Sequence, residues 1–144
     1  MIKFIPAEDT FAIRHNVLLA HRQSAEDCRF PPDEEEGSFH LGYFADGELA
    51  CIATFHRQPH PDFPGSGYQL RGMATVSGYR KKGLGNQVVN FAIIYLRGQK
   101  VNYLWCNARR IAYPFYLGLG FEFISDEFDI DPIGPHRKMY LKIQ

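Results

Sequence analysis

A run of basic residues and glycines in the middle of the chain has the composition of a phosphate-binding loop. The run is Arg80-Lys81-Lys82-Gly83-Leu84-Gly85-Asn86. Glycine has no Cβ, so the backbone at Gly83 and Gly85 can approach phosphate oxygens closely. The three basic side chains supply charge for charge-assisted hydrogen bonds to such oxygens. The segment therefore predicts a site for a phosphate or pyrophosphate group.

Two common phosphate-binding motifs do not fit this loop. A P-loop requires a lysine directly after its second glycine, but Leu84 follows Gly83. A dinucleotide-binding fingerprint requires a third glycine, and Val88 stands in that place. The pattern that remains is Arg80-x-x-Gly83-x-Gly85.

A helix is predicted to begin directly after the loop and to end near Gly98. Its apolar positions recur every three to four residues, at Leu84, Val88, Phe91, Ala92, Tyr95 and Leu96. The first N–H groups of a helix have no internal partner and carry the positive end of the helix dipole. A phosphate bound by the loop would satisfy them.

The elements before the loop are mostly strands. Asp46-Gly47 lies between two apolar runs and favours a tight antiparallel hairpin. Residues 11–19 predict a helix, and the proline-containing segments 29–38 and 60–67 predict loops. The predicted strands are residues 2–5, 39–45, 48–57 and 68–76.

The elements after the helix complete a mixed α/β pattern. We expect a short helix at residues 109–118, with Pro114 in its first turn. Strands are expected at residues 101–106, 121–128 and 138–143. No repeat or linker is visible, so the whole chain, residues 1–144, is expected to be one domain.

Charge and composition exclude several classes of protein. Sixteen basic and sixteen acidic residues give zero net charge, without the basic surplus of a nucleic-acid-binding protein. A net charge near zero favours self-association, so we expect a homodimer. No apolar run could span a membrane and no signal peptide is apparent, which predicts a cytoplasmic protein. Cys28, Cys51 and Cys106 are too widely spaced for a zinc site, so no metal is expected.

The phosphate-loop pattern, taken with its neighbours, resembles the GCN5-related N-acetyltransferases (GNAT). The loop matches that family's pyrophosphate loop, and Met73-Ala74-Thr75-Val76 resembles its fourth strand. Asn107-Ala108-Arg109 and Ala112-x-x-Phe115-Tyr116-x-x-x-Gly120-Phe121 resemble its fifth strand, fourth helix and sixth strand. The resemblance covers nearly the whole chain and is strongest to a bacterial subgroup. It implies a GNAT acyl-CoA N-acyltransferase fold, with a mostly antiparallel twisted sheet and about four helices.

The resemblance implies that acetyl-coenzyme A is the co-substrate and that the acceptor is a small-molecule amine. Two alternatives remain open, a protein or peptide N-acetyltransferase and a coenzyme A-binding domain without turnover. The residues that the resemblance assigns to the cofactor are Met73, Ala74, Thr75, Val76, Arg80, Lys81, Lys82, Gly83, Leu84, Gly85, Asn86, Asn107 and Arg109. Relatives commonly carry asparagine in place of Arg109.

Acetyl transfer also needs an acid and a base. Tyr116 aligns with the tyrosine that protonates the departing thiolate in this family, and a phenol is protonated at neutral pH. His136, in a predicted loop, and Glu122 are candidates for the base. Arg14, His40 and Arg71 are candidates for acceptor binding, because an arginine can pair with an acceptor carboxylate.

Overall fold

The computed structural model describes residues 1–144 and has the mixed α/β fold class that the sequence predicts. The chain folds into two compact units. The first unit contains Met1–Arg57 and Arg71–Ala92. The second contains Gln58–Leu70 and Ile93–Gln144.

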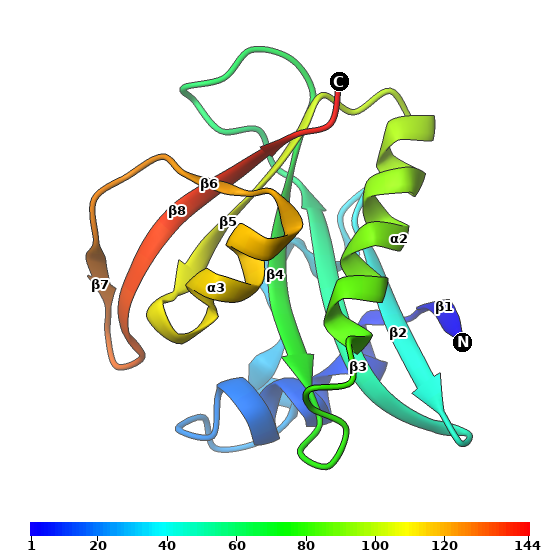
Figure 1. Ribbon diagram of the computed structural model, residues 1–144. Helices are drawn as coiled ribbons and strands as arrows, with labels where there is room; N and C mark the ends of the chain where they lie inside the picture. The colour runs from blue at the N-terminus through cyan, green and yellow to red at the C-terminus, as the bar shows by residue number, and fades with distance from the viewer. The chain divides into compact units, whose positions relative to one another are not determined.

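Three antiparallel strands in hydrogen-bonded order β1-β2-β3 begin the sheet of the first unit (Figure 1). The predicted hairpin turn is confirmed, since Asp46 and Gly47 have φ angles of 53° and 79°. Positive φ at both central residues is the geometry that Asp-Gly favours in such a turn. The strand bounds are β1 Ile2–Ile5, β2 Phe39–Ala45 and β3 Glu48–Arg57.

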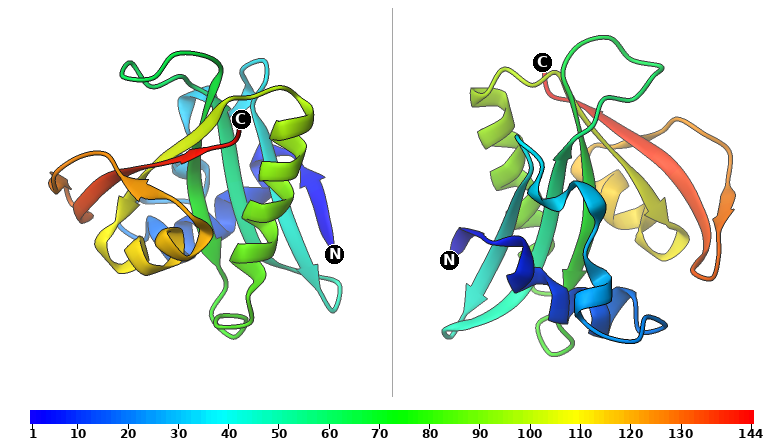
Figure 2. Two further views of the ribbon diagram at one scale, coloured as in Figure 1. Left: turned by 45° about the horizontal axis from the view of Figure 1, so that its top comes forward. Right: turned by 180° about the vertical axis from the view of Figure 1, so that it is seen from behind.

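The predicted helix at residues 11–19 is short and irregular. The α1 helix, Phe11–Ile13, follows a 3₁₀ turn and runs into a π-helical turn. The segments around it pack on one side of β2 and β3, which the rear view of Figure 2 brings to the front. Ile13 packs there against Ile52 of β3 in the apolar core. The non-α turns are Ala7–Thr10, Arg14–Leu18, Glu26–Cys28 and Pro31–Glu34.

Strand β4, Gly67–Thr75, and helix α2, Leu84–Gly98, confirm the strand–loop–helix order predicted around the glycine-containing segment. The residues of β4 from Arg71 onward belong to the first unit, as do the first turns of α2. Gly72 has a φ of 62° inside the strand. A left-handed residue of this kind bends a strand locally and is tolerated best by glycine.

The sheet of the second unit has the order β4-β5-β8-β6, and β7 also pairs with β8. The parallel β4–β5 ladder joins only Gly67–Gln69 to Tyr103–Trp105. Strands β5 and β8 are antiparallel and lie side by side (Figure 1). The bounds are β5 Tyr103–Arg109, α3 Tyr113–Leu119 after a 3₁₀ turn at Arg110–Ala112, β6 Glu122–Phe123, β7 Phe128–Ile130 and β8 Gly134–Lys142.

Two predictions in this unit were wrong. The single strand expected at residues 121–128 is divided into β6 and β7. Between them the Ser125 hydroxyl accepts a hydrogen bond from the Lys138 N–H at 2.8 Å, so a side chain replaces the backbone partner of β8. His136 lies on β8 rather than in a loop, because that strand extends to pair with Arg109.

Helix α3 confirms the expected position of Pro114, which lies in its first turn. The helix ends at Gly120, whose φ of 101° is the left-handed conformation of a glycine C-cap. The structure contains three α-helices rather than about four, since short 3₁₀ and π turns replace most of the first helical region.

All three cysteines are buried and unpaired. Burial raises the pKa of Cys51 to about 11 and also raises the pKa values of Cys28 and Cys106. A thiol in this state is largely protonated at neutral pH and reacts slowly. None of the helices combines the length and apolarity that crossing a bilayer requires.

Candidate active site

The loop between β4 and α2 contains three residues in the left-handed backbone conformation. Gly78, Lys81 and Gly83 have φ angles of 94°, 63° and 77°. Successive residues that alternate between right- and left-handed conformations turn their N–H groups toward a common concave side. A Cβ built at Gly78 or at Gly83 meets no atom within 4 Å, so open space adjoins both residues.

Unpaired donors continue from the loop into the first turn of α2. The hydrogen bond from the Gln87 N–H to the Gly83 carbonyl, at 3.1 Å, is the first of the helical series. The N–H groups of Leu84, Gly85 and Asn86 therefore precede the ladder of the helix. They stand at its positive end, beside exposed Lys81 and Lys82.

Some groups at the end of β4 are already engaged within the protein. The Val76 N–H donates to the Ala50 carbonyl at 2.8 Å, and the Tyr79 N–H donates to the Val76 carbonyl at 3.0 Å. The Arg80 Nε donates to the Thr75 carbonyl at 3.2 Å. The Arg80 side chain thus links the loop to the end of β4. The backbone N–H of Val76 is not available to a ligand.

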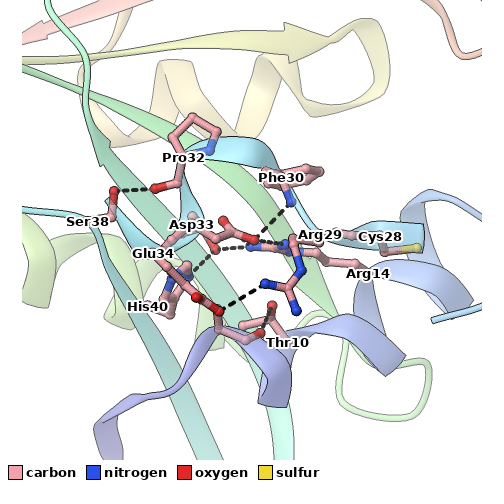
Figure 3. Close-up of polar contacts among 12 residues, drawn as sticks. Thr10, Arg14, Cys28, Arg29, Phe30, Pro32, Asp33, Glu34, Ser38 and His40 are labelled. Carbon is pink, nitrogen blue, oxygen red and sulfur yellow. Dashed lines mark hydrogen bonds and ion pairs between the residues drawn. The ribbon is translucent and has the colours of Figure 1, made fainter. Parts of the chain in front are cut away.

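A polar cluster is buried in the first unit, where Arg14 points at Asp33 (Figure 3). The Arg14 guanidinium donates two hydrogen bonds to the Asp33 carboxylate, at 2.7 and 3.1 Å. It also donates to the Cys28 carbonyl at 2.9 Å and to the Thr54 hydroxyl at 2.6 Å. Burial raises the pKa of Asp33, but hydrogen bonds from His56 and Arg14 outweigh it and hold the pKa well below its usual range.

Two buried histidines complete the cluster. The His40 Nε2 donates to the Asp33 carbonyl at 3.0 Å, which leaves the His40 Nδ1 to accept from the Thr54 hydroxyl at 2.8 Å. The His56 Nε2 lies 2.9 Å from the Asp33 carboxylate and donates to it. Burial lowers the pKa of His40, and the hydrogen bond to the Asp33 carbonyl offsets this only in part. The hydrogen-bond partners therefore place a neutral imidazole at His40.

Arg71 lies at the edge of this cluster, on β4. Its Cζ is 4.1 Å from the centroid of the Phe30 ring, and the Arg14 Cζ is 3.9 Å from the same centroid. Burial lowers the pKa of Arg71, as does the charge of Arg14, while Asp33 raises it. The structure thus brings Arg14, His40 and Arg71 into one region.

Sequence reasoning missed Asp33 and Phe30 as members of this region. Asp33 follows two prolines and precedes three glutamates, so its position in the sequence indicated an exposed acidic loop. The only available signal was Arg14 itself, since a buried arginine requires an acidic partner.

In the second unit, Tyr116 is buried on α3 and lies close to Arg109 of β5. The Tyr116 ring packs edge-on against the rings of Phe115 and Phe121, with centroids 5.0 and 5.2 Å apart. Burial lowers the pKa of Arg109 and the nearby Tyr116 raises it. Asn107, also on β5, accepts a hydrogen bond from the Lys138 ammonium at 2.9 Å.

The two candidate bases lie in different surroundings. His136 is buried, and its Nδ1 donates to the Gly134 carbonyl at 2.7 Å. Because a carbonyl only accepts, a neutral His136 ring carries its lone pair on Nε2. Glu122 is exposed on β6, opposite Tyr140 of β8. A buried imidazole with a lone pair fits the role of base more closely than an exposed carboxylate.

Comparison with known proteins gives one family and one near relative. Residues 8–121 match the model of the Acetyltransferase (GNAT) family. A relative from Bacillus subtilis (strain 168), named "Uncharacterized N-acetyltransferase YitI", is 44% identical over 140 residues. The alignment covers 96% of this chain and 93% of that protein.

Solved structures share the fold at low sequence identity. An aminoglycoside 6′-N-acetyltransferase complexed with coenzyme A matches with a TM-score of 0.78 and 14% identity, over 100% of this chain and 97% of that chain. The ribosomal-protein-S18-alanine N-acetyltransferase from Escherichia coli matches with a TM-score of 0.77 and 21% identity, over 99% and 93%. At these identities the likeness concerns the fold alone.

Proposed function

Because the chain belongs to the GNAT family of acetyltransferases, we propose that it transfers the acetyl group of acetyl-coenzyme A to the amine of a small molecule. Transfer occurs by direct attack within a ternary complex, where holding both reactants together supplies much of the acceleration. The observation that carries the proposal is the loop between β4 and α2, with its left-handed residues, open glycine positions and unpaired N–H groups.

The loop and β4 hold the cofactor in this proposal. The pyrophosphate lies against the N–H groups from Gly83 to Asn86, beside Lys81 and Lys82. The Leu84 side chain is buried, so that residue contributes only its backbone. Backbone groups of Met73, Ala74 and Thr75 hold the arm that carries the thioester, and Val76 contributes no N–H. Asn107 and Arg109 contact the cofactor from β5.

The chemistry is one acyl substitution. The neutral amine nitrogen attacks the thioester carbonyl carbon, forming a C–N bond, and the C–S bond breaks to release the coenzyme A thiolate. A backbone N–H near Ala74 or Thr75 stabilises the negative charge on the carbonyl oxygen. The amine loses one proton and the thiolate gains one, so the amide and the free thiol balance the reaction.

Two protein groups handle these protons. The Nε2 of His136 accepts the proton of the amine, with Glu122 acting through water as the alternative base. The Tyr116 hydroxyl gives a proton to the departing thiolate. Burial of both Tyr116 and His136 supports these roles, since it limits competition from bulk water.

Release of free thiol from acetyl-coenzyme A tests the proposal. We expect an acceptor-dependent rate with at least one member of a panel of amino acids, polyamines, aminoglycosides and short peptides. Calorimetry with coenzyme A reports cofactor binding separately. Binding without turnover on any acceptor would indicate a coenzyme A-binding domain, and turnover on peptides alone would indicate a peptide acetyltransferase.

Three properties of the whole protein belong to the same proposal. Residues 1–144 act as one catalytic domain, in the cytoplasm and as a homodimer. Three unpaired cysteines suit a reducing compartment, and zero net charge favours self-association. Cell fractionation tests the location, and sedimentation equilibrium tests the dimer.

A further inference from the structure

Arg71 is a partly buried cation that forms no ion pair and donates no side-chain hydrogen bond within the protein. Its one close side-chain partner is the Phe30 ring, at 4.1 Å from the Arg71 Cζ. A guanidinium group has five N–H donors in a planar fork. Stacking on a ring uses the face of that fork and leaves its edge available for an acceptor.

The charge around Arg71 is positive and not balanced. Asp33 is the one acidic group that acts on Arg71 appreciably, and its carboxylate is fully bound by Arg14 and His56. The charges of Arg14 and Arg22 both act on Arg71 unfavourably. Arg22 also has no acidic partner, since its guanidinium donates to the Asp27 carbonyl. An anion beside Arg71 would therefore be attracted by two arginines, Arg71 and Arg22, neither of which is paired with a carboxylate.

The ring on which Arg71 stacks also contacts a second, firmly bound guanidinium group, that of Arg14. Phe30 lies within about 4 Å of two guanidinium groups, and the Asp33 carboxylate fixes one of them by accepting two hydrogen bonds from Arg14. Gly72 brings the β4 backbone onto the same cluster, since a Cβ there would lie 3.2 Å from the Arg14 Nε. A pre-positioned guanidinium loses less entropy when it binds a carboxylate.

We infer that the acceptor amine carries a carboxylate, which Arg71 binds through a two-pronged hydrogen bond. The inference rests on the proposed function and narrows its substrate class to amino acids and other small amino carboxylates. Arg71 lies two residues before Met73 on β4, which places their Cα atoms at most about 7 Å apart. It therefore stands close to the backbone proposed to hold the thioester, at a separation that one small molecule can bridge.

Matched pairs of acceptors test this inference. Initial rates of thiol release would be measured for glycine, β-alanine, γ-aminobutyrate and lysine, each beside its carboxamide. The carboxamide has the less basic amine, so chemical reactivity favours it over the carboxylate. We nevertheless expect at least one carboxylate to exceed its carboxamide by about tenfold or more in kcat/KM, as a charge-assisted pair predicts.

Two substitutions assign the preference to Arg71. In Arg71→Gln the preference should fall to less than about threefold, through a higher KM with kcat nearly unchanged. Arg71→Lys keeps the charge without the planar fork and should retain part of the preference. Arg29→Gln is the matched control, because Arg29 is exposed and already paired with Glu34 at 3.0 Å. It should behave as the wild type, and coenzyme A affinity should be equal in all four proteins.

The possible results distinguish a failure of this inference from a failure of the proposed acetyltransferase function. Carboxamides that react as well as carboxylates, or a preference that survives in both Arg71 variants, would overturn the role of Arg71. Turnover on polyamines or aminoglycosides would in that case leave acetyl transfer intact. If no amine of any kind is acetylated while coenzyme A still binds, the proposed function fails first and the inference fails with it.

Discussion

Among single residues, Asp33 has the most partners in the buried polar cluster. It accepts hydrogen bonds from Arg14, from His56 and from the Phe30 N–H, and its own carbonyl accepts one from His40. A buried carboxylate with this many donors stabilises a fold only while the donors remain, because its desolvation is not otherwise offset. Loss of any charged partner therefore lowers the free energy of unfolding by more than the energy of the lost hydrogen bond alone.

Replacement of Arg14 measures that dependence. Arg14→Met should lower the free energy of unfolding by about 3–5 kcal/mol, because the Asp33 carboxylate stays buried without its cation. Urea denaturation followed by fluorescence gives the value. Arg29→Met is the control, since its ion pair with Glu34 is exposed, and it should leave the midpoint within error. Similar losses in both variants would contradict the importance given to the buried pair.

Tyr116 provides a residue-scale test of the chemistry. Tyr116→Phe removes only the hydroxyl and keeps the packing against Phe115 and Phe121. Turnover should fall roughly 10²-fold, while coenzyme A affinity stays constant. Tyr113→Phe is the neighbouring control, because the Tyr113 hydroxyl donates to Glu127 instead. An undiminished rate in Tyr116→Phe would remove the acid role from this residue.

At the scale of elements, the β4–loop–α2 unit combines a bent strand, a left-handed turn and the start of a helix. Each part is encoded locally, by glycine at three of the four positions where φ is positive and by the apolar periodicity of the helix. Arg80 ties the parts together through its bond to the Thr75 carbonyl. The bend, the turn and the start of the helix therefore follow from the local sequence, independently of the proposed anion site.

Gly83→Val tests the loop, and Gly47→Val separates cofactor binding from backbone strain. The two glycines have φ angles of 77° and 79°, and a Cβ at either meets open space. Both substitutions should lower the melting temperature by similar amounts, because valine disfavours positive φ. Only Gly83→Val should also lose the calorimetric signal of coenzyme A binding, since its side chain fills the space assigned to phosphate. Binding retained by Gly83→Val would contradict the loop assignment.

The elements were predictable where local pattern decided them. The Asp46-Gly47 hairpin, β4 and α2 follow from turn chemistry and periodicity, and they were placed within one or two residues. The divided strand β6/β7 was not predictable, because the Ser125 hydroxyl replaces a backbone acceptor only once β8 is in place. The position of the loop between β4 and α2 was predictable for the same local reason, and its role in cofactor binding stays a prediction.

The polar cluster was not predictable, because its partners are distant in sequence. Arg14 meets Asp33 across 19 positions and Thr54 across 40. The intervening segment has prolines and charges but no periodicity that would place Asp33 inside. Arg71 could be named as a candidate for acceptor binding from its residue type alone. Its stacking on Phe30 could be seen only in the tertiary structure.

For the molecule as a whole, the buried carboxylate links stability to acidity. The pKa of Asp33 is lower in the folded chain than its value of about 3.9 in an unfolded chain. A lowered pKa stabilises the fold fully above about pH 4, and this contribution is lost as the pH falls toward the folded pKa. The fold should therefore weaken below about pH 4.

Urea midpoints between pH 7 and pH 3 measure this linkage. The wild type should lose stability steeply below about pH 4, whereas the double variant Arg14→Met, Asp33→Leu should show a shallower dependence. The exposed control Glu34→Gln should follow the wild type. Parallel curves for the wild type and the double variant would show that other carboxylates dominate the acid response.

The burial of Cys28, Cys51 and Cys106 has a practical consequence for enzymology. A chromogenic aromatic disulfide turns yellow when it exchanges with the thiol of coenzyme A. It should not react rapidly with the buried cysteines of the native protein. A slow rise in absorbance without acceptor would then report transient local unfolding, because a buried cysteine reacts only when the surrounding structure opens. The same reagent can thus measure both coenzyme A release and local unfolding, because the two occur on separate timescales.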